Sequence, residues 1–251
     1  MKMHKHMGKL AGLTLFVFFL AVSLAGASDF SDKAAIANDR TQNQENRMKA
    51  ILDLGSSSNE NAAPILLCIL KSTSEDQRIR TSAVLALENL GRPRLTIIRA
   101  LETAYSEPDA GKNFRYTVLM SMGKMKAVES LDFLTRALSN SDSMIRLKAF
   151  QALGALKNES ALQVMARYMT TEQDYMVRAA GVRAAGQSRS ATTEAMIVKA
   201  LRNDPAPLVR YNAAILLRQF DPLSADAKAA IEAARNDESS VVRKAAKEIL
   251  P

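Results

Sequence analysis

The chain has 251 residues, of which 47% are hydrophobic and 24% are charged, and its net charge is +8. Its single cysteine, Cys68, excludes an internal disulfide. Trp is absent and aromatic residues make up only 5% of the chain, while segments rich in Ala, Leu and Met are frequent. This composition, with few strand-forming runs, predicts an all-α protein.

Residues 1–27 have the organisation of a secretory signal peptide. The segment begins with three Lys and no acid, continues as an uncharged apolar run from Leu10, and ends in an A-x-A cleavage site at 25–27. We therefore expect export, which for a bacterial protein means the periplasm or the cell exterior, with a mature chain that starts near Ser28. An uncleaved membrane anchor is the alternative, because about 18 apolar residues can just span a bilayer.

The signal peptide also contains both histidines, His4 and His6, and three of the basic residues. The mature chain then has no imidazole and is only mildly basic. Ser-His and Cys-His catalysis are excluded, as is an iron site with histidine ligands. The G-x-S-x-G, C-x-x-C and H-E-x-x-H motifs and Gly-rich phosphate loops are also missing. We predict a non-enzymatic protein with no cofactor and no metal site.

The polar segment 28–42 predicts a flexible leader. From residue 43 onward one pattern recurs: an apolar helical segment, a short turn with a helix-capping Asp, Ser or Asn, and a second helix marked by an arginine. This arginine follows Val, Ile or Phe in all repeats but one, and it returns at intervals of 31 to 35 residues. The seven arginines are Arg47, Arg80, Arg115, Arg146, Arg178, Arg210 and Arg243.

The positions one before, three after and seven after each arginine are mostly apolar or small, and they share one stripe of a helix. A unit of two helices and about 32 residues cannot bury both of its apolar faces alone, whereas stacked units can. The sequence therefore predicts a repeat array over residues 43–251. It consists of a half-repeat at 43–55 followed by six full repeats.

Two phrases, DPAPLVRYNAA at 204–214 and DESSVVRKAA at 237–246, resemble the short HEAT-like repeats of phycobilin lyases and bacterial HEAT-repeat proteins. The resemblance covers residues 43–251 and departs from the usual pattern at Phe114 and Val118. It implies a right-handed α-solenoid of stacked helical hairpins, a HEAT-like superhelix.

Each arginine lies near the middle of the packed stripe, where an unpaired charge would be strongly destabilising. The resemblance implies that acids of the same turn or the next repeat neutralise the arginines in a ladder between repeats. A row of phosphate-binding arginines is the alternative. The acids that recur four or six residues before an arginine are Asp76, Asp109, Asp142, Asp174, Asp204 and Asp237.

In the HEAT family the second helix of each repeat lines the concave surface. Positions two, five and nine after the arginine point away from the packed stripe and form a polar, mildly basic row. We predict a monomeric scaffold that binds a polar or acidic protein or peptide through this row. Nucleic acid is not expected, because bases and acids alternate along the helices and export removes the chain from DNA. The residues of the row are Thr117, Lys124, Lys148, Gln151, Arg183, Gln187, Asn212 and Gln219.

Two alternatives stay open at this point. The resemblance to phycobilin lyases suggests an accessory subunit or chaperone that holds a small ligand such as a bilin. An uncleaved N-terminal helix would instead give a membrane-anchored form of the scaffold. Cys68, within PILLCILK, is expected to be a buried small hydrophobe, and the methionines are expected to fill gaps in the core.

Overall fold

The structure is a computed structural model that describes residues 28–249, so the predicted signal peptide at 1–27 lies outside the described residues. All regular elements of the described part are helices. The chain divides into two compact units, with the boundary after Ala100, and each unit is described by itself. Within residues 28–249 no helix has the length and apolar character that crossing a bilayer requires.

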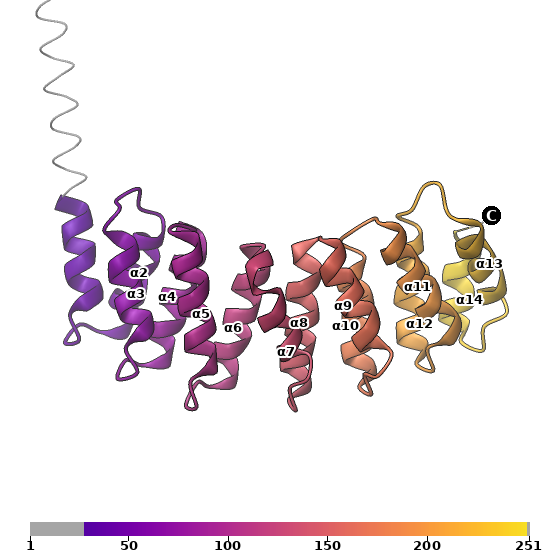
Figure 1. The fold of residues 1–251 in the computed structure, drawn as a ribbon, viewed down its shortest axis with the longest axis horizontal. Coiled ribbons are helices and arrows are strands. Elements are labelled where there is room, and N and C mark those ends of the chain that lie inside the picture. Colours follow the sequence, from indigo (N-terminus) through magenta and orange to yellow (C-terminus); the bar gives the residue numbers. More distant parts are fainter. Residues whose placement is uncertain (1–27, 250–251) are drawn as a thin grey trace, which may run out of the picture. The chain divides into compact units, whose positions relative to one another are not determined.

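Unit 1 contains a half-repeat and a helical pair (Figure 1). The half-repeat is α2 (Gln44–Gly55), and the pair is α3 (Ala62–Lys71) and α4 (Gln77–Leu90). Helix α4 packs against both α2 and α3. The unit boundary falls inside α5 (Arg94–Ser106).

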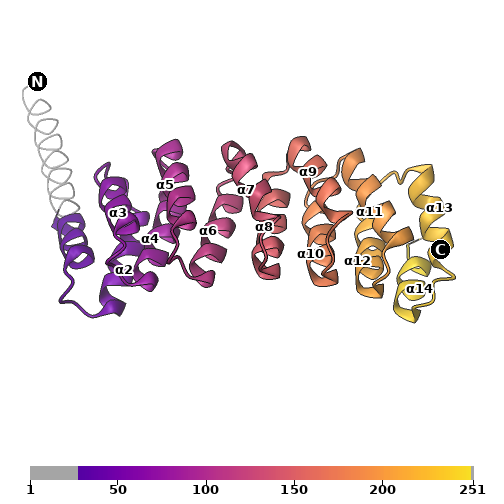
Figure 2. The same cartoon turned by 60° about the horizontal axis from the view of Figure 1, so that its bottom comes forward.

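Unit 2 continues the same alternation of first and second helices, which we call helix A and helix B of each repeat. Figures 1 and 2 show the A helices α9, α11 and α13 in one layer and the B helices α8, α10, α12 and α14 in another. Each B helix contacts the next along the layer. The elements after α5 are α6 (Lys112–Lys124), the 3-10 turn η1 (Val128–Ser130), α7 (Leu131–Ala137), α8 (Ser143–Leu156), α9 (Glu159–Met169), α10 (Tyr175–Ala185), α11 (Ala191–Asn203), α12 (Pro207–Leu217), α13 (Ala225–Ala234) and α14 (Ser240–Lys247).

Short polar side chains begin most of these helices. In α8 the Asp142 carboxylate accepts hydrogen bonds from the N–H groups of Met144 and Ile145, and in α10 the Asp174 carboxylate accepts one from Met176. Such a cap satisfies N–H groups that have no partner within the helix, and its negative charge favours the helix dipole.

The apolar stripe of each B helix forms the core within its unit. In α8 the stripe residues Ile145, Ala149 and Leu153 are at most 2% exposed. Glycine at the end of the stripe lets neighbouring B helices approach closely. A Cβ atom placed on Gly154 would lie 2.4 Å from the carbonyl oxygen of Ala184 in α10, so a side chain there would force the two helices apart. The predicted all-α class and hairpin stacking are thus confirmed.

Two features of unit 1 differ from the sequence-based expectation. The segment predicted as a flexible leader is helical over residues 28–38, where Ala37 is fully buried and its carbonyl oxygen accepts hydrogen bonds from Arg47. A run of Ala and Ile after Lys33 provides the helix-forming, partly apolar surface that this packing needs. Cys68 is exposed instead of buried, because α3 turns Leu66 and Leu70 to the core and the thiol to a surface hollow of 520 Å³.

Candidate functional site

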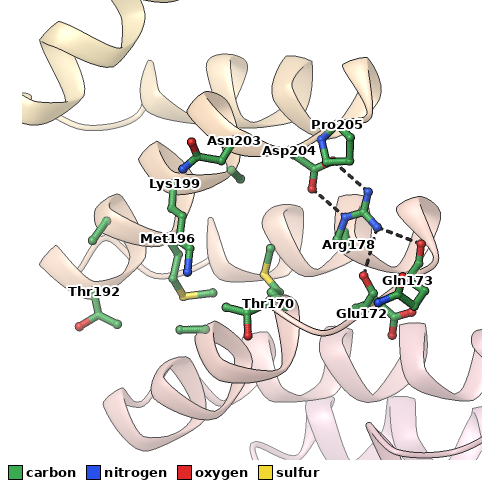
Figure 3. Close-up of a pocket in the computed structure, with 14 residues that line it drawn as sticks. Thr170, Glu172, Gln173, Arg178, Thr192, Met196, Lys199, Asn203, Asp204 and Pro205 are labelled. Carbon is green, nitrogen blue, oxygen red and sulfur yellow. Dashed lines mark hydrogen bonds and ion pairs between the residues drawn. The ribbon is translucent and has the colours of Figure 1, made fainter.

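The repeated arginine of α10 shows how the ladder is built (Figure 3). Nε and Nη2 of Arg178 donate to the two carboxylate oxygens of Asp204, at 2.7 and 3.0 Å, and Asp204 belongs to the next repeat. Nη1 of Arg178 donates to the backbone carbonyls of Glu172 and Gln173. The two paired side chains are only 12% and 8% exposed. The guanidinium therefore links two turns of neighbouring repeats with a bidentate, charge-assisted contact.

The same bidentate contact between an arginine and a carboxylate, which we call a fork, recurs elsewhere in unit 2 and in unit 1. Arg210 donates to both oxygens of Asp237 at 2.8 and 2.9 Å. Arg146 donates to both oxygens of Glu172 at 2.8 and 2.9 Å. Each of these acids comes six residues before the next ladder arginine. In unit 1 the glutamate five residues before the next arginine takes this place: Arg47 donates to both oxygens of Glu75 at 3.0 and 3.1 Å.

Sequence analysis overlooked Glu75 and Glu172, because it searched the columns for aspartate alone. The position of Glu172 in the repeat could have identified it, because it stands six residues before Arg178, as Asp204 stands six residues before Arg210. The carboxylates of Glu172 and Asp204 also accept the backbone N–H two residues further on, which fixes them at the turn.

Three of the other predicted acids have a different position, whereas Asp109 stands six residues before Arg115, as most ladder acids do before the next arginine. Asp76, Asp142 and Asp174 stand four residues before an arginine and cap the helix, so they are not the ladder acids. Asp142 also pairs with Lys112 at 2.7 Å. Asp109 lies exposed in the turn between α5 and α6.

The other three predicted ladder arginines donate to backbone carbonyls. Arg80, which is 1% exposed, donates from Nε to the carbonyl of Leu70 at 2.8 Å. Arg115 donates to the carbonyls of Tyr105 and Glu107, and its guanidinium lies 5.7 Å from the centre of the Tyr105 ring. Arg243 donates to the carbonyls of Asp237 and Glu238.

The ladder changes the protonation equilibria of its members. Hydrogen bonds from Arg47 are the main cause that lowers the pKa of Glu75 below its usual value. Burial raises the pKa of Glu172, but hydrogen bonds from Arg146 and from the N–H of Asp174 outweigh burial, and the pKa ends below its usual value. The hydrogen bond to Asp204 raises the pKa of Arg178 further above its already high value. All these groups are therefore charged at neutral pH.

The residues predicted to bind a partner are all located on or directly after the B helices of unit 2. Arg183, Gln187, Lys124 and Gln219 are exposed, and the other four residues are half-buried. Lys148 donates to the side-chain oxygen of Gln151 at 3.3 Å, so these two lie together on α8. The side-chain nitrogen of Asn212 is buried and has no hydrogen-bond partner among the described residues.

The B helices of unit 2 contain no acidic residue. The sequences of α6, α8, α10, α12 and α14 include Lys and Arg but neither Asp nor Glu. Acids occur instead in the A layer, for example Glu159 in α9, Glu194 in α11 and Asp226 in α13. The expectation that bases and acids alternate along the helices is therefore wrong for the B layer of unit 2, because the two signs are separated between layers.

A groove of 690 Å³ lies in the A layer of unit 2, between α9 and α11 (Figure 3). Its floor is formed by Met169, Met196 and three alanines, and its polar end is the Arg178–Asp204 pair. Among residues 28–249 no group of three or more His, Cys, Asp or Glu side chains is arranged to hold a metal ion.

These features define a class: a helical-hairpin repeat protein whose buried arginines bind the turn of the following repeat. The family profile for HEAT repeats matches residues 98–186 and 168–250, which is more than half of the chain. The chain belongs to the HEAT-repeat family. No curated protein matches the sequence.

Several solved structures are similar to this chain at low sequence identity. Human deoxyhypusine hydroxylase in complex with glycerol is 18% identical, covers 91% of this chain and 96% of its own, and has a TM-score of 0.42. The complex of CpcE and CpcF of phycocyanin lyase from Nostoc is 19% identical, covers 87% of both chains, and has a TM-score of 0.48. An engineered protein is 17% identical, covers 88% of this chain and 67% of its own, and has a TM-score of 0.49.

Proposed function

We propose that the protein is an exported, non-enzymatic HEAT-repeat scaffold that binds an acidic segment of a partner protein on the B layer of unit 2. The observation that carries this proposal is the absence of Asp and Glu from all five B helices of that unit. A surface of one sign attracts a partner of the opposite sign and speeds its association.

The cations of the B layer differ in whether they are engaged with acids. The ladder members Arg146, Arg178 and Arg210 are engaged with carboxylates of the next repeat. By contrast, Arg183 on α10 and Lys244 and Lys247 on α14 are exposed and form no ion pair with any described residue. We assign the binding role to these three residues, together with Lys148 and Gln151.

Support for a scaffold in place of an enzyme comes from side-chain chemistry. Residues 28–251 contain no histidine, and their only cysteine is in unit 1, whereas the basic row belongs to unit 2. The ladder guanidiniums are occupied, so they are not available to bind a substrate phosphate. The proposal of export is supported by residues 1–27, with their basic start, apolar run and A-x-A site.

In-cell photo-crosslinking tests the binding proposal. A benzoylphenylalanine placed at Gln151 should crosslink a partner in the cell that makes the protein. The same group placed at Glu232 on the A helix α13 should not. The double change Lys148→Glu and Arg183→Glu should abolish the crosslink at neutral pH, because it reverses two of the charges that face the acidic segment.

Three outcomes would contradict the proposal. The crosslinks from the two positions could be equal, or the charge-reversed variant could crosslink normally. The crosslinked species could also be nucleic acid, in which case binding would fall steeply with salt and the partner would not be a protein. Mass spectrometry of the mature N-terminus tests export separately, and a chain that begins near Ser28 is expected.

A further inference from the structure

A second binding region lies in the A layer of unit 2, on helices that the proposed function does not use. We propose that the groove between α9 and α11 binds a free fatty acid of medium chain length. The aliphatic chain would lie against Met169 and Met196, and the carboxylate would lie at the ammonium group of Lys199. This site is independent of the basic B layer, so either proposal can fail alone.

The floor of the groove is apolar and adaptable. Ala166 of α9 faces Ala195 and Ala200 of α11, and these small side chains leave open space between the two helices. Met169 and Met196 complete the floor. Methionine is unbranched and flexible, so it adapts its shape to an aliphatic chain.

Gly181 of α10 gives the Met169 side chain more room in this repeat. It takes the position three after the arginine, where the neighbouring repeats have Ala149 and Ala213. A Cβ atom on Gly181 would lie 3.2 Å from the sulfur of Met169. The Met169 side chain therefore packs against α10, in space that a Cβ atom would restrict, and it also lines the groove between α9 and α11.

The charges around the groove leave one cation uncompensated. Asp204 is paired with Arg178, and Glu172 is paired with Arg146. Lys199 is exposed and forms no ion pair with any described residue. Both Lys199 and Met196 line the groove from α11, and Figure 3 draws their side chains near one another. An anionic head group with an apolar tail therefore complements the groove better than a neutral or cationic molecule does.

The dimensions of the groove suit a linear molecule. Its volume of 690 Å³ is within the range of small-molecule sites, roughly 300–1,000 Å³. The lining residues of α11 run from Thr192 to Asn203, which corresponds to about 16 Å along the helix axis. A single unbranched chain fits along this path.

Fluorescence with dansylaminoundecanoate as the probe tests the proposal on the mature chain. We expect the dansyl emission to rise on binding and dodecanoate to displace the probe. Dodecanol, which has the same chain without the charge, should displace it more weakly. Lys199→Gln should weaken dodecanoate binding by about tenfold, because a charge-assisted hydrogen bond is lost. It should leave dodecanol binding unchanged.

Lys228→Gln, on the neighbouring A helix α13, is the matched control, because Lys228 is also an exposed lysine. It should bind dodecanoate like the wild type. Equal weakening by the two lysine substitutions, or no displacement by dodecanoate at all, would overturn the proposal.

Methyl-labelled methionine provides a readout that does not depend on any variant folding. In ¹³C–¹H spectra of the wild-type chain, dodecanoate should shift the methyl signals of Met169 and Met196. It should leave Met144 unchanged, since that side chain is exposed on the B helix α8. Shifts at Met144 that equal those at Met196 would show non-specific adsorption and would contradict the site.

Discussion

Two neighbouring arginine contacts of unit 2 differ in the residue that the next repeat supplies, which is a glutamate in one and an asparagine in the other. Glu172 and Asn140 stand at equivalent positions, six residues before an arginine, and each accepts the backbone N–H two residues further on. Both oxygens of Glu172 also accept hydrogen bonds from Arg146 of the preceding repeat. Asn140 holds the corresponding position for Arg115, and Arg115 contacts no carboxylate of the described residues.

The difference teaches what the fold requires of its arginines. Arg115 is stabilised by the carbonyls of Tyr105 and Glu107 and by the Tyr105 ring. A guanidinium between repeats must therefore be hydrogen-bonded, but an acid from the next repeat is not essential. The rung with the acid is expected to couple its repeats more strongly than the rung without it.

The largest effect is expected at Arg210, which is 6% exposed and donates to both oxygens of Asp237. Arg210→Ala should lower the free energy of unfolding by about 3–5 kcal/mol, because Asp237 is left as a buried charge that has lost its arginine. Urea denaturation followed by circular dichroism measures this change. A loss below 1 kcal/mol would show that the ladder is not stabilising.

Arg115→Ala should have a smaller effect, because no carboxylate is left unpaired. We expect a loss of about 1–2 kcal/mol from two backbone hydrogen bonds and one cation–π contact. The same denaturation experiment applies. If Arg115→Ala proves as damaging as Arg210→Ala, the acid adds nothing to the rung.

Acid pH should weaken the rungs that contain carboxylates. The pKa of Glu172 is lower in the folded chain than its usual value, so its contribution to stability is present above the unfolded pKa of about 4.3 and is lost as the pH falls through the folded pKa. The stability difference between the wild type and Glu172→Gln should therefore be largest at pH 7 and shrink below about pH 4.

Thermal unfolding between pH 3 and 7 tests this prediction. Glu45→Gln, an exposed residue in the first turn of α2, is the control and should show a small difference at every pH. A difference for Glu172→Gln that grows as the pH falls would have the wrong sign for the proposed ion pair.

The smallest change is expected from adding an acid. Asn140→Asp places a carboxylate where the neighbouring rungs have one, and it should stabilise unit 2 by up to about 1 kcal/mol. Double substitution with Arg115→Ala should remove this gain. A gain that persists without Arg115 would mean that the new charge acts on the helix dipole of α8 alone.

Much of the fold could be predicted because it repeats. The seven arginines recur within the same short sequence pattern, and this pattern located the B helices. The apolar stripe that includes Ile145 and Ala149 predicted which helix faces are buried. Asp204 and Asp237 were also among the predicted ladder acids, and the structure places both in forks. The choice between these positions and Asp142 or Asp174 depended on turn geometry, since a cap and a ladder acid differ by only two residues.

Other features could not be predicted from the pattern. The groove includes Met169, whose sulfur would lie 3.2 Å from a Cβ atom on Gly181 of another helix. The helix over residues 28–38 depends on a contact between Ala37 and Arg47, whereas local composition indicated a leader. Both features depend on packing between different helices, and the periodic sequence pattern contains no information about such packing.

The central claim is that ladder arginines hold the repeats together, while Arg183, Lys244 and Lys247 of the B layer are available to bind a partner. Arg178 and Arg183 are five residues apart on α10 and allow one matched measurement, the free energy of unfolding of Arg178→Gln and of Arg183→Gln. The claim predicts a loss of about 3 kcal/mol for the first and less than about 0.5 kcal/mol for the second. Equal losses, or a larger loss for Arg183→Gln, would contradict it.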